Sequence, residues 1–303
     1  MSRRQPSIAI VGAGGLARTM ARALGRAGSV TVVVAARRPA AAAGIARGAR
    51  RVRAAERIDD AVASADVLLL AVPDGAIAAV ARSLARLRPS WRGTVVLHAA
   101  GALGPEPLAV LAKRGASTGV LHPLAVLPRS GRGRLSGAAA RIEGSPKATR
   151  AARRLAALVG LVPLSGRALA TPRGRQAYHA AASLASNDLV ALLVVAADLL
   201  VRAGVAKSSA TRALASLASG TIAQTRSAGL PGALTGPVAR GDTGTVAAQM
   251  EALRSADPDA AEAHRALSLR LVAFAQASGH LDPAAASVLR RSLARGWQRS
   301  ATV

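Results

Sequence analysis

The hydrophobic residues in the first half of the chain are gathered in short runs and do not recur at helical spacing. Such runs occupy residues 8–11, 30–34, 66–72, 94–97 and 119–121, and the stretches between them are rich in alanine. A continuous apolar run is typical of a strand that is buried on both faces of a parallel sheet. The alternation of these strands with helices predicts an α/β fold with a doubly wound parallel sheet. Two weaker strand candidates follow at residues 141–143 and 161–164.

The second half of the chain has a different pattern, which predicts helices only. Long helical stretches cover residues 173–202 and 208–227. Asp257 and Asp282 each precede a proline, as an N-cap residue does when proline is the first residue of the helix. We therefore expect a domain boundary near residue 170, which gives an α/β domain at 1–169 and an all-helical domain at 170–303.

A glycine-rich turn follows the first strand and precedes a helix-like stretch at residues 17–27. Strand, glycine turn and helix in this order form a dinucleotide-binding pattern. In that pattern the first glycine makes a tight turn, the second lets backbone N–H groups approach a pyrophosphate, and a small third residue lets the helix pack on the strand. The alternative is a purely structural turn. The candidate cofactor-binding residues here are Gly12, Gly14, Gly15, Leu16 and Ala17.

The end of the second strand favours NADP over NAD as the cofactor. An NAD site usually has an acidic residue at this place, which binds the ribose 2′-hydroxyl. Residues 35–39 contain no acid, and instead Arg37 and Arg38 stand side by side. Paired arginines suit a 2′-phosphate because they form charge-assisted hydrogen bonds with it. In an arginine-rich chain the pair also arises by chance, so the missing carboxylate carries more of the argument.

Three further strand ends carry candidate residues. Val72 and Pro73 end the third predicted strand, and His98 and His122 follow the next two. In open α/β sheets ligands bind at the carboxyl ends of the strands, so we expect these residues to face the cofactor crevice. The alternatives are a plain strand-to-helix turn at Pro73 and purely structural histidines.

A polar stripe runs along the long helix predicted at residues 173–202. Arg175, His179, Ser183 and Asn187 follow one another at four-residue steps and so share one helix face. Their neighbours are mainly alanine and leucine. The stripe is either a solvated helix face or, as we favour, the lining of a cleft.

A loop with polar residues separates two of the predicted helices. Residues 234–242 contain glycine and proline, together with Thr235, Arg240 and Asp242. Arg240 is a candidate to bind a substrate carboxylate, with Thr235 beside it. Alternatively, the loop is only a helix break, and Asp242 caps the next helix.

The net charge of +26 raises the question of nucleic-acid binding. Only three of the 41 basic residues are lysines, the arginines are scattered along the chain, and aromatic residues make up 1% of it. These features indicate a GC-rich coding sequence, so we expect weak binding to polyanions but no specific nucleic-acid partner.

Other compositional features exclude several kinds of site. Cysteine is absent, and no cluster of histidine and carboxylate residues has metal-ligand spacing, so we expect no disulfide and no metal. The start of the chain does not resemble a secretory signal, which favours a cytoplasmic location. The apolar run at residues 189–200 is too short and too interrupted to predict a membrane span.

Several segments in this order resemble one family. They are residues 12–17, 71–74, 119–124, 178–187 and 234–242, of which Tyr-His-Ala-Ala-Ala and Thr-Gly-Pro-Val-Ala-Arg-Gly-Asp are the most specific. Together they resemble Rossmann-like oxidoreductases with a C-terminal helical domain of the DUF2520 type. Their fold is similar to that of 6-phosphogluconate-dehydrogenase-type enzymes, including ketopantoate and pyrroline-5-carboxylate reductases. The His-Pro segment at residues 122–123 is also similar to a motif of prephenate dehydrogenases.

This resemblance implies NADP-dependent redox chemistry but does not fix a substrate. Our leading hypothesis is an NADP-dependent reductase of a small carboxylate-bearing ketone or imine, with a ketopantoate-like 2-oxo acid as the single best guess. The expected catalytic residues are His122 or His179 as proton donor and Asn187 as a group that orients the carbonyl. Ser183, Thr235 and Arg240 would bind the substrate. Many enzymes of the wider superfamily have a lysine on the long helix where this chain has Arg175, and arginine is a poor general acid.

A homodimer packed through the helical domain is also expected by resemblance. The main alternative is a non-catalytic NADP-binding sensor or scaffold. A prephenate-dehydrogenase-like enzyme and a basic nucleic-acid-binding protein are less favoured.

Overall fold

The computed structural model describes residues 5–63 and 65–294. Its internal contacts divide the chain into two units, residues 1–187 and 188–303, and each is described by itself. The division falls inside one long helix, about four turns after its first residue. The predicted boundary near residue 170 lies just before the first residue of that helix.

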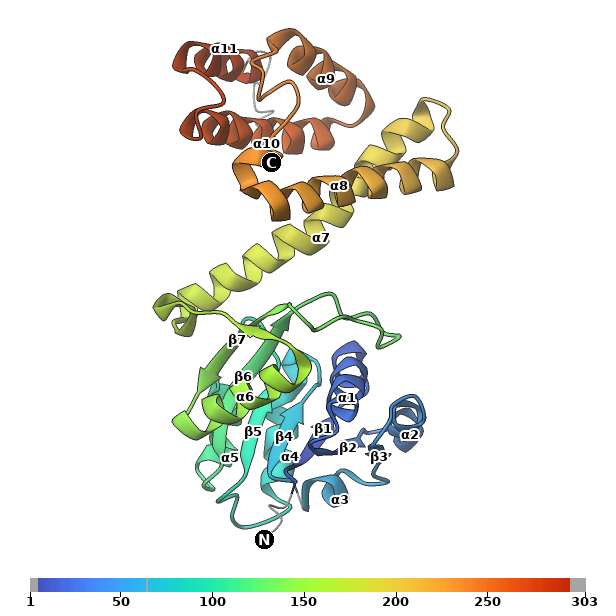
Figure 1. Ribbon diagram of the computed structural model, residues 1–303, viewed down its shortest axis with the longest axis vertical. Helices are drawn as coiled ribbons and strands as arrows, with labels where there is room; N and C mark the ends of the chain where they lie inside the picture. The colour runs from blue at the N-terminus through green and yellow to red at the C-terminus, as the bar shows by residue number, and fades with distance from the viewer. Residues whose placement is uncertain (1–4, 64, 295–303) are drawn as a thin grey trace, which may run out of the picture. The chain divides into compact units, whose positions relative to one another are not determined.

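The first unit is built on an eight-stranded sheet in the order β3-β2-β1-β4-β5-β6-β7-β8 (Figure 1). The first six strands of this order are parallel, which confirms the doubly wound architecture, whereas β7 runs antiparallel to β6. The order 3-2-1-4-5-6 is that of a Rossmann sheet, in which ligands bind where the order reverses, between β1 and β4. The strands are β1 (Ser7–Val11), β2 (Thr31–Ala35), β3 (Val52–Ala54), β4 (Val67–Leu70), β5 (Val95–His98), β6 (Ser117–Leu124), β7 (Ala139–Gly144) and β8 (Val162–Pro163).

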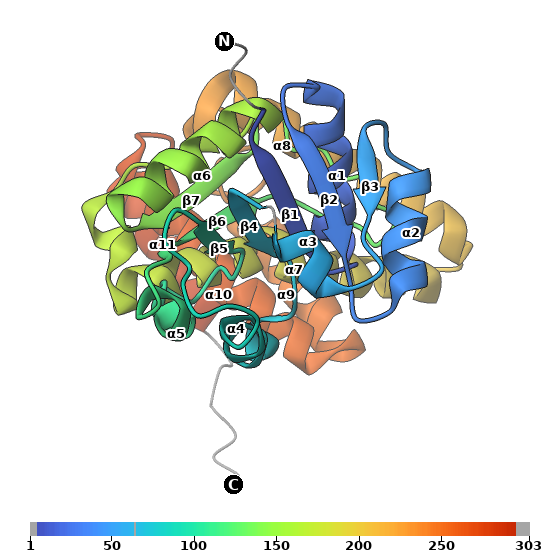
Figure 2. The same cartoon turned by 90° about the horizontal axis from the view of Figure 1, so that it is seen from below.

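Helices cover both faces of this sheet (Figure 2). One apolar core lies under α1, α2 and α6 and includes Met20, Leu24 and Leu155. The other lies under α3, α4 and α5 and includes Leu84 and the fully buried Trp91. Strands buried on both faces need the continuous apolar runs seen in the sequence. The helices are α1 (Gly15–Ala27), α2 (Pro39–Arg47), α3 (Ile58–Ala63), α4 (Ile77–Ala85), α5 (Ala109–Ala112) and α6 (Pro146–Val159).

The sequence pattern did not predict β3. This edge strand is three residues long and reads Val-Arg-Ala, and two of its three residues are exposed. A strand this short and this exposed needs no apolar run, so its pairing with β2 leaves no mark in the hydrophobic pattern.

The second unit is helical, as the sequence predicts. It contains the end of α7 (Pro172–Arg202), then α8 (Lys207–Ala233), α9 (Thr243–Ala256), α10 (Pro258–Ala277) and α11 (Pro283–Ala294). Helices α9 to α11 enclose a small core that includes Met250, Val272 and Leu289. The side chains of Asp257 and Asp282 accept hydrogen bonds from N–H groups of the following helix, which confirms both predicted N-caps.

Helices α7 and α8 expose apolar side chains. The exposed fractions of Leu184, Val190 and Leu217 are 66%, 60% and 68%. Within α7 an 18-residue window has a mean hydropathy of 2.0, and 6% of it is buried, so by length and composition this helix could cross a membrane. The sequence argument against a span considered only residues 189–200, whereas the helix continues well before them. One such helix is weak evidence for a membrane, because exposed apolar residues also mark protein–protein contacts.

Candidate active site

The glycine turn connects β1 to α1 at the point where the strand order reverses. Gly12 has a φ of 139°, and a Cβ on it would collide with the backbone carbonyl of Ala71, which follows β4. The position therefore requires glycine for both conformation and space. Gly14 is the N-cap residue of α1, and a Cβ on it would meet nothing within 4 Å. Ala17 is fully buried against the sheet, as its small size allows.

The start of α1 is suited to an anion. No side chain caps it, so the N–H groups of its first turn have no side-chain acceptor. Gly15 approaches the backbone carbonyls of Leu127 and Pro128, which would leave no room for a Cβ, and Leu16 is half-buried beside it. The open space over Gly14, together with unpaired N–H groups at a helix N-terminus, fits a pyrophosphate.

Two other predicted cofactor contacts lie at the same carboxyl edge. Arg37 and Arg38 follow β2, and both are exposed. Neither side chain makes a hydrogen bond or ion pair with another described residue, so both guanidinium groups are free to bind a ligand. Val72 and Pro73 follow β4, where Val72 is half-buried and Pro73 is exposed. Pro73 precedes a short 3-10 helix, Asp74–Ala76, which the Asp74 side chain does not cap.

His98, the last residue of β5, is fully buried, and both of its ring nitrogens are used within the protein. Nδ1 accepts a hydrogen bond from the N–H of Ala100 at 3.1 Å, so the ring proton is on Nε2, which donates to the carbonyl of Gly104 at 2.7 Å. Burial lowers the pKa of His98 and keeps the ring neutral. Its observed function is to hold the loop after β5, and its contribution to cofactor binding stays a prediction.

His122 and His179 come together beside Gly101. A Cβ on Gly101 would lie 3.0 Å from Nε2 of His122 and 2.9 Å from Nδ1 of His179, so both nitrogens face the same point. Nδ1 of His122 shares a 2.9 Å hydrogen bond with the hydroxyl of Tyr178, and the two rings meet edge to face at 5.5 Å. His122 is on β6, whereas Tyr178 and His179 are on α7. The structure therefore brings the two predicted histidines together, and Tyr178 positions one of them.

The electrostatics of this pair decide its protonation. Burial, with the positive charge of Arg141 nearby, lowers the pKa of His122 to about 4, and burial raises the pKa of Tyr178 to about 12. Both groups are therefore neutral at pH 7. The expectation that His122 donates a proton because it titrates near pH 7 is thus wrong in its premise, because a half-buried imidazole beside a guanidinium resists protonation.

A network of ion pairs around two buried arginines holds together the segments near the histidines. The carboxylate of Glu143 on β7 accepts hydrogen bonds from Arg141 at 2.5 Å and from Arg175 at 2.8 Å. Arg141, which is 1% exposed, also donates to the carbonyls of Ala100 and Leu103. Arg175 bridges further to Glu106 at 3.1 Å. The network joins β7, the start of α7 and the loop after β5. His179 lies on α7, and β7 pairs with β6, the strand that carries His122.

The sequence reasoning missed most of this network. Arg141 and Glu143 were seen only as part of a weak strand, although alternate residues on one strand share a face. Tyr178 was noted in a motif but given no function, although it is the only tyrosine in the chain. The available signal was Arg141, a basic residue on the same strand face as the carboxylate of Glu143. In a chain with 41 basic residues, one such arginine does not stand out.

The polar stripe is on α7, as predicted, but its members differ in environment. Arg175 is buried and held by carboxylates, so it supports the structure and does not line a cleft with its charge. Ser183 is half-buried, and His179 and Asn187 are exposed. Of the four residues, only His179 is placed beside another predicted catalytic group. The binding of substrate by Ser183 and of its carbonyl by Asn187 stays a prediction.

The polar loop of the second unit ends at a helix cap. Asp242 accepts hydrogen bonds from the N–H and the hydroxyl of Thr245, at 3.0 and 2.6 Å, and these bonds lower its pKa. The interpretation of Asp242 as a helix cap is therefore confirmed. Thr235 and Arg240 are exposed, as a binding loop requires. Their binding of substrate stays a prediction.

A metal centre is not part of this arrangement. Among residues 5–63 and 65–294, no group of three or more histidine, cysteine or carboxylate side chains could hold an ion. The groups available for ligand binding and catalysis at this edge are the uncapped start of α1, two exposed arginines and two adjacent histidines.

Comparison with solved structures defines the class of the fold. At 20% identity the chain matches the protein TM1727 of Thermotoga maritima, with a TM-score of 0.65 over 90% of this chain and 99% of that one. At 20% identity it matches a reductive aminase of Aspergillus terreus in complex with NADPH and ethyl-5-oxohexanoate, with a TM-score of 0.62 over 95% and 99% of the two chains. At 16% identity it matches a pyrroline-5-carboxylate reductase of Coxiella burnetii, with a TM-score of 0.60 over 88% and 99%. At these identities the likeness establishes the fold, a Rossmann domain followed by a helical domain.

The family models agree with the resemblance in the sequence motifs. Residues 1–123 match the Rossmann-like domain, and residues 138–271 match DUF2520, a domain of unknown function. The chain therefore consists largely of a Rossmann-like domain followed by a DUF2520 domain. No curated protein gives a significant sequence match.

Proposed function

We propose that this protein is an NADPH-dependent reductase of a small ketone or imine that carries a carboxylate. The observation that carries the proposal is the convergence of His122 and His179 at the same sheet edge as the uncapped start of α1. Ligands of Rossmann sheets bind at this edge. The fold is shared with a reductive aminase that binds NADPH and with a reductase of pyrroline-5-carboxylate, a cyclic imine with a carboxylate.

The residues at the carboxyl edge fit NADPH. The pyrophosphate would lie over Gly14, where a Cβ would meet nothing within 4 Å, and would accept hydrogen bonds from the first turn of α1. Arg37 and Arg38 would bind the 2′-phosphate, since neither is paired with another described residue. The bound cofactor would supply a hydride to the substrate carbon.

The histidines would act on the substrate oxygen or nitrogen. If Tyr178 donates to Nδ1 of His122, the ring proton of His122 is on Nε2, the nitrogen that faces Gly101 and His179. His122 has a pKa of about 4 and is therefore neutral at pH 7, so it cannot act as an imidazolium acid. A neutral His122 instead polarises the C=O or C=N bond by donating a hydrogen bond. We assign proton donation to the exposed His179, which leaves an alcohol or amine as product.

The substrate carboxylate needs a cation. Arg240 is the candidate, because it is exposed in a loop and makes no hydrogen bond or ion pair with another described residue through its side chain. A ketopantoate-like 2-oxo acid is the best single substrate class for a ketone, and a cyclic imino acid is the corresponding class for an imine.

A screen of NADPH oxidation against 2-oxo acids and cyclic imino acids tests the activity, and a thermal shift with NADP⁺ tests the cofactor site separately. We expect Gly14→Asp to abolish the shift, because its carboxylate would repel the pyrophosphate. We expect His179→Ala to reduce kcat and leave the shift unchanged. Full activity in a protein that lacks both His122 and His179 would refute the histidine assignment.

The same measurements distinguish the sensor or scaffold alternative. That function predicts a shift with NADP⁺ that Gly14→Asp removes, but no turnover with any member of the substrate panel. The half-buried, neutral His122 is compatible with both functions, whereas the exposed His179 beside it favours catalysis.

We also propose that the protein is a homodimer formed through α7 and α8. These helices expose leucine, valine and isoleucine side chains along their length, which a second copy would cover. A lipid-facing helix is the other way to cover such a surface. Light scattering of the detergent-free protein distinguishes the two, because a homodimer gives twice the monomer mass and remains in solution without detergent.

A further inference from the structure

The first unit has a cavity that the proposed function does not use. It is a cavity of about 460 Å³ between α1, the segment 131–136 that links β6 to β7, and the end of α6. Four arginines line it, and none of the other described lining residues is acidic. We call it the arginine pocket; its cations are Arg22, Arg26, Arg132 and Arg134.

Local backbone structure builds this pocket. Gly131 has a φ of 70° and is buried, and a Cβ on it would collide with the Cβ of Arg18 on α1. The glycine thus lets the segment lie directly against the helix. A Cβ on Gly133 would be 2.9 Å from the carbonyl of Val126, so this position is also tightly packed. The alternation Gly-Arg-Gly-Arg at 131–134 fixes the backbone with its glycines and supplies two cations with its arginines.

The positive charge of the pocket is not neutralised. Arg22 donates hydrogen bonds to the carbonyls of Ser130 and Gly48, which carry no charge. The side chains of Arg26, Arg132 and Arg134 make no hydrogen bond or ion pair with any described residue, and all three are exposed. Residues 1–55 and 107–142, which supply nearly the whole lining, contain no aspartate or glutamate. Four close cations without a counter-charge repel one another and attract an anion.

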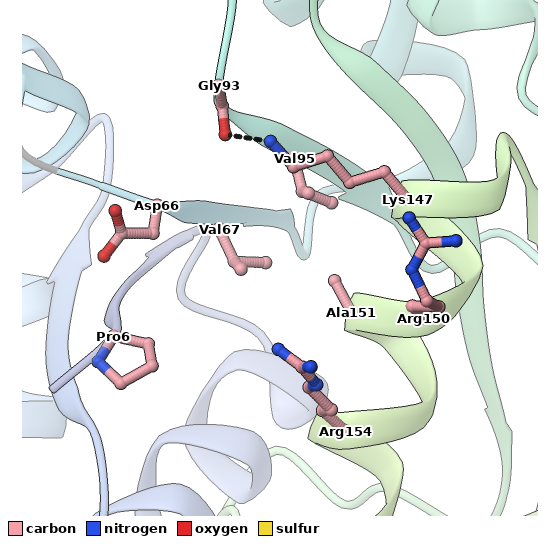
Figure 3. A pocket seen from close by; sticks show the side chains of 9 residues that line it. All are labelled: Pro6, Asp66, Val67, Gly93, Val95, Lys147, Arg150, Ala151 and Arg154. Atoms are coloured by element: carbon pink, nitrogen blue, oxygen red, sulfur yellow. Dashed lines mark hydrogen bonds between the residues drawn. The ribbon is translucent and has the colours of Figure 1, made fainter. Parts of the chain in front are cut away.

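Another cavity, at the amino ends of the strands, has cations that are partly neutralised (Figure 3). It too measures about 460 Å³ and is lined by Lys147, Arg150 and Arg154 of α6. However, Asp66 lies on its opposite wall, and Lys147 already donates to the carbonyl of Gly93 at 2.8 Å. That cavity therefore has fewer free cations and a carboxylate, so the arginine pocket is the stronger anion site.

We propose that the arginine pocket binds a compact polyphosphate anion, separately from the cofactor. Guanidinium groups bind phosphate oxygens through paired hydrogen bonds, and four of them match a ligand with three or more negative charges. The volume is that of a small-molecule site. A nucleic acid would present phosphates along an extended surface, and it is disfavoured because no aromatic residue lines the pocket to stack on a base.

The test uses tripolyphosphate as the probe in calorimetry at 150 mM salt, with the full-length protein. Because any arginine-rich protein binds polyanions weakly, the key comparison is between two variants with the same loss of charge. The pocket variant is Arg26→Gln/Arg132→Gln/Arg134→Gln. The control variant is Arg82→Gln/Arg86→Gln/Lys113→Gln. These exposed residues lie on α4 or directly after α4 and α5, at the opposite face of the sheet.

We expect one tripolyphosphate per chain, an affinity reduced at least tenfold in the pocket variant, and a change below twofold in the control. Equal weakening in both variants would overturn the proposal, because it would show general electrostatic attraction. Loss of binding in Arg37→Gln/Arg38→Gln would also overturn it, since the probe would then occupy the proposed cofactor site. Displacement of the probe by a single-stranded oligonucleotide at equal phosphate concentration would favour a nucleic acid instead.

Discussion

Substitution by alanine should affect different properties at two glycines of the same turn: stability at Gly12 and ligand binding at Gly14. At Gly12 a methyl group would collide with the carbonyl of Ala71, and the φ of 139° is strained for any residue with a Cβ. At Gly14 a methyl group would enter open space at an ordinary φ of −76°. Gly12→Ala should therefore damage the fold, whereas Gly14→Ala should damage only ligand binding.

The magnitudes follow from these contacts. Backbone strain of this kind costs about 1–3 kcal/mol, and overpacking a tight contact costs about 1–3 kcal/mol more. Gly12→Ala should thus lower the free energy of unfolding by about 2–6 kcal/mol. For a unit of 150–250 residues each kcal/mol lowers Tm by roughly 2–4 °C, so we expect a decrease of about 4–24 °C. Gly14→Ala should change Tm by less than about 2 °C without ligand, since it relieves no contact and creates none.

The ligand dependence completes the comparison. At a concentration 100-fold above its Kd, NADP⁺ should stabilise the wild-type protein by about 2.7 kcal/mol. Gly14→Ala should lose most of this stabilisation, because its methyl group occupies the space over the helix start. Differential scanning fluorimetry of the three proteins, with and without NADP⁺, measures both effects. If Gly14→Ala binds NADP⁺ as tightly as the wild type, the pyrophosphate does not lie over this turn. If Gly12→Ala unfolds at the wild-type temperature, the steric argument fails.

Three further predictions concern stability and assembly. Burial lowers the pKa of His122 to about 4, so an unfolded chain takes up a proton between about pH 6.5 and 4 that the folded protein does not. The free energy of unfolding of the wild type should therefore fall by about 2–3 kcal/mol as the pH is lowered over this range. Urea unfolding at several pH values should show a smaller decrease in His122→Gln. Glu143→Gln removes the negative charge that pairs with two buried guanidinium groups and replaces one of the two accepting oxygens by an NH₂ donor, so it should cost about 3–5 kcal/mol in urea unfolding. Arg57→Gln, which breaks an exposed pair with Asp59, should cost less than about 1 kcal/mol. Leu217→Glu places a charge on the exposed apolar surface of α8 and should halve the mass measured by light scattering without lowering Tm; an unchanged mass would place the dimer contact elsewhere.

The sheet could be predicted from the sequence because its strands are buried on both faces. Such strands must be apolar throughout, and residues 8–11 and 94–97 show this pattern directly. β3 could not be predicted, because an exposed edge strand of three residues needs no such run. The antiparallel direction of β7 could not be predicted either, since the direction depends on how the chain returns after β6 and not on the residues of β7.

The candidate site was predicted as a set of residues but not as a set of contacts. Strand ends and helical spacing were enough to select His122 and His179, since those patterns depend on local periodicity. The buried carboxylate of Glu143 and its two arginines depend on which segments meet in space. Arg141 and Glu143 are two residues apart on one strand and so share a face, but the contact with Arg175, 32 residues away, follows no local pattern. In this chain the abundance of arginine also conceals the few arginines that are buried.

The partners of the histidines, more than their positions, determine what each can do. His98 and His122 both lie on neighbouring strands β5 and β6, and burial lowers the pKa of each. Both nitrogens of His98 form hydrogen bonds with backbone groups of the loop after β5. His122 gives one nitrogen to Tyr178 and keeps the other directed toward His179. A neutral ring with one free nitrogen can hold an oxygen or nitrogen atom in place, but it does not change its charge near pH 7. Reduction at this site should therefore show no titration of His122 between pH 5 and 8, and any ionisation seen in that range of the kcat profile must come from another group.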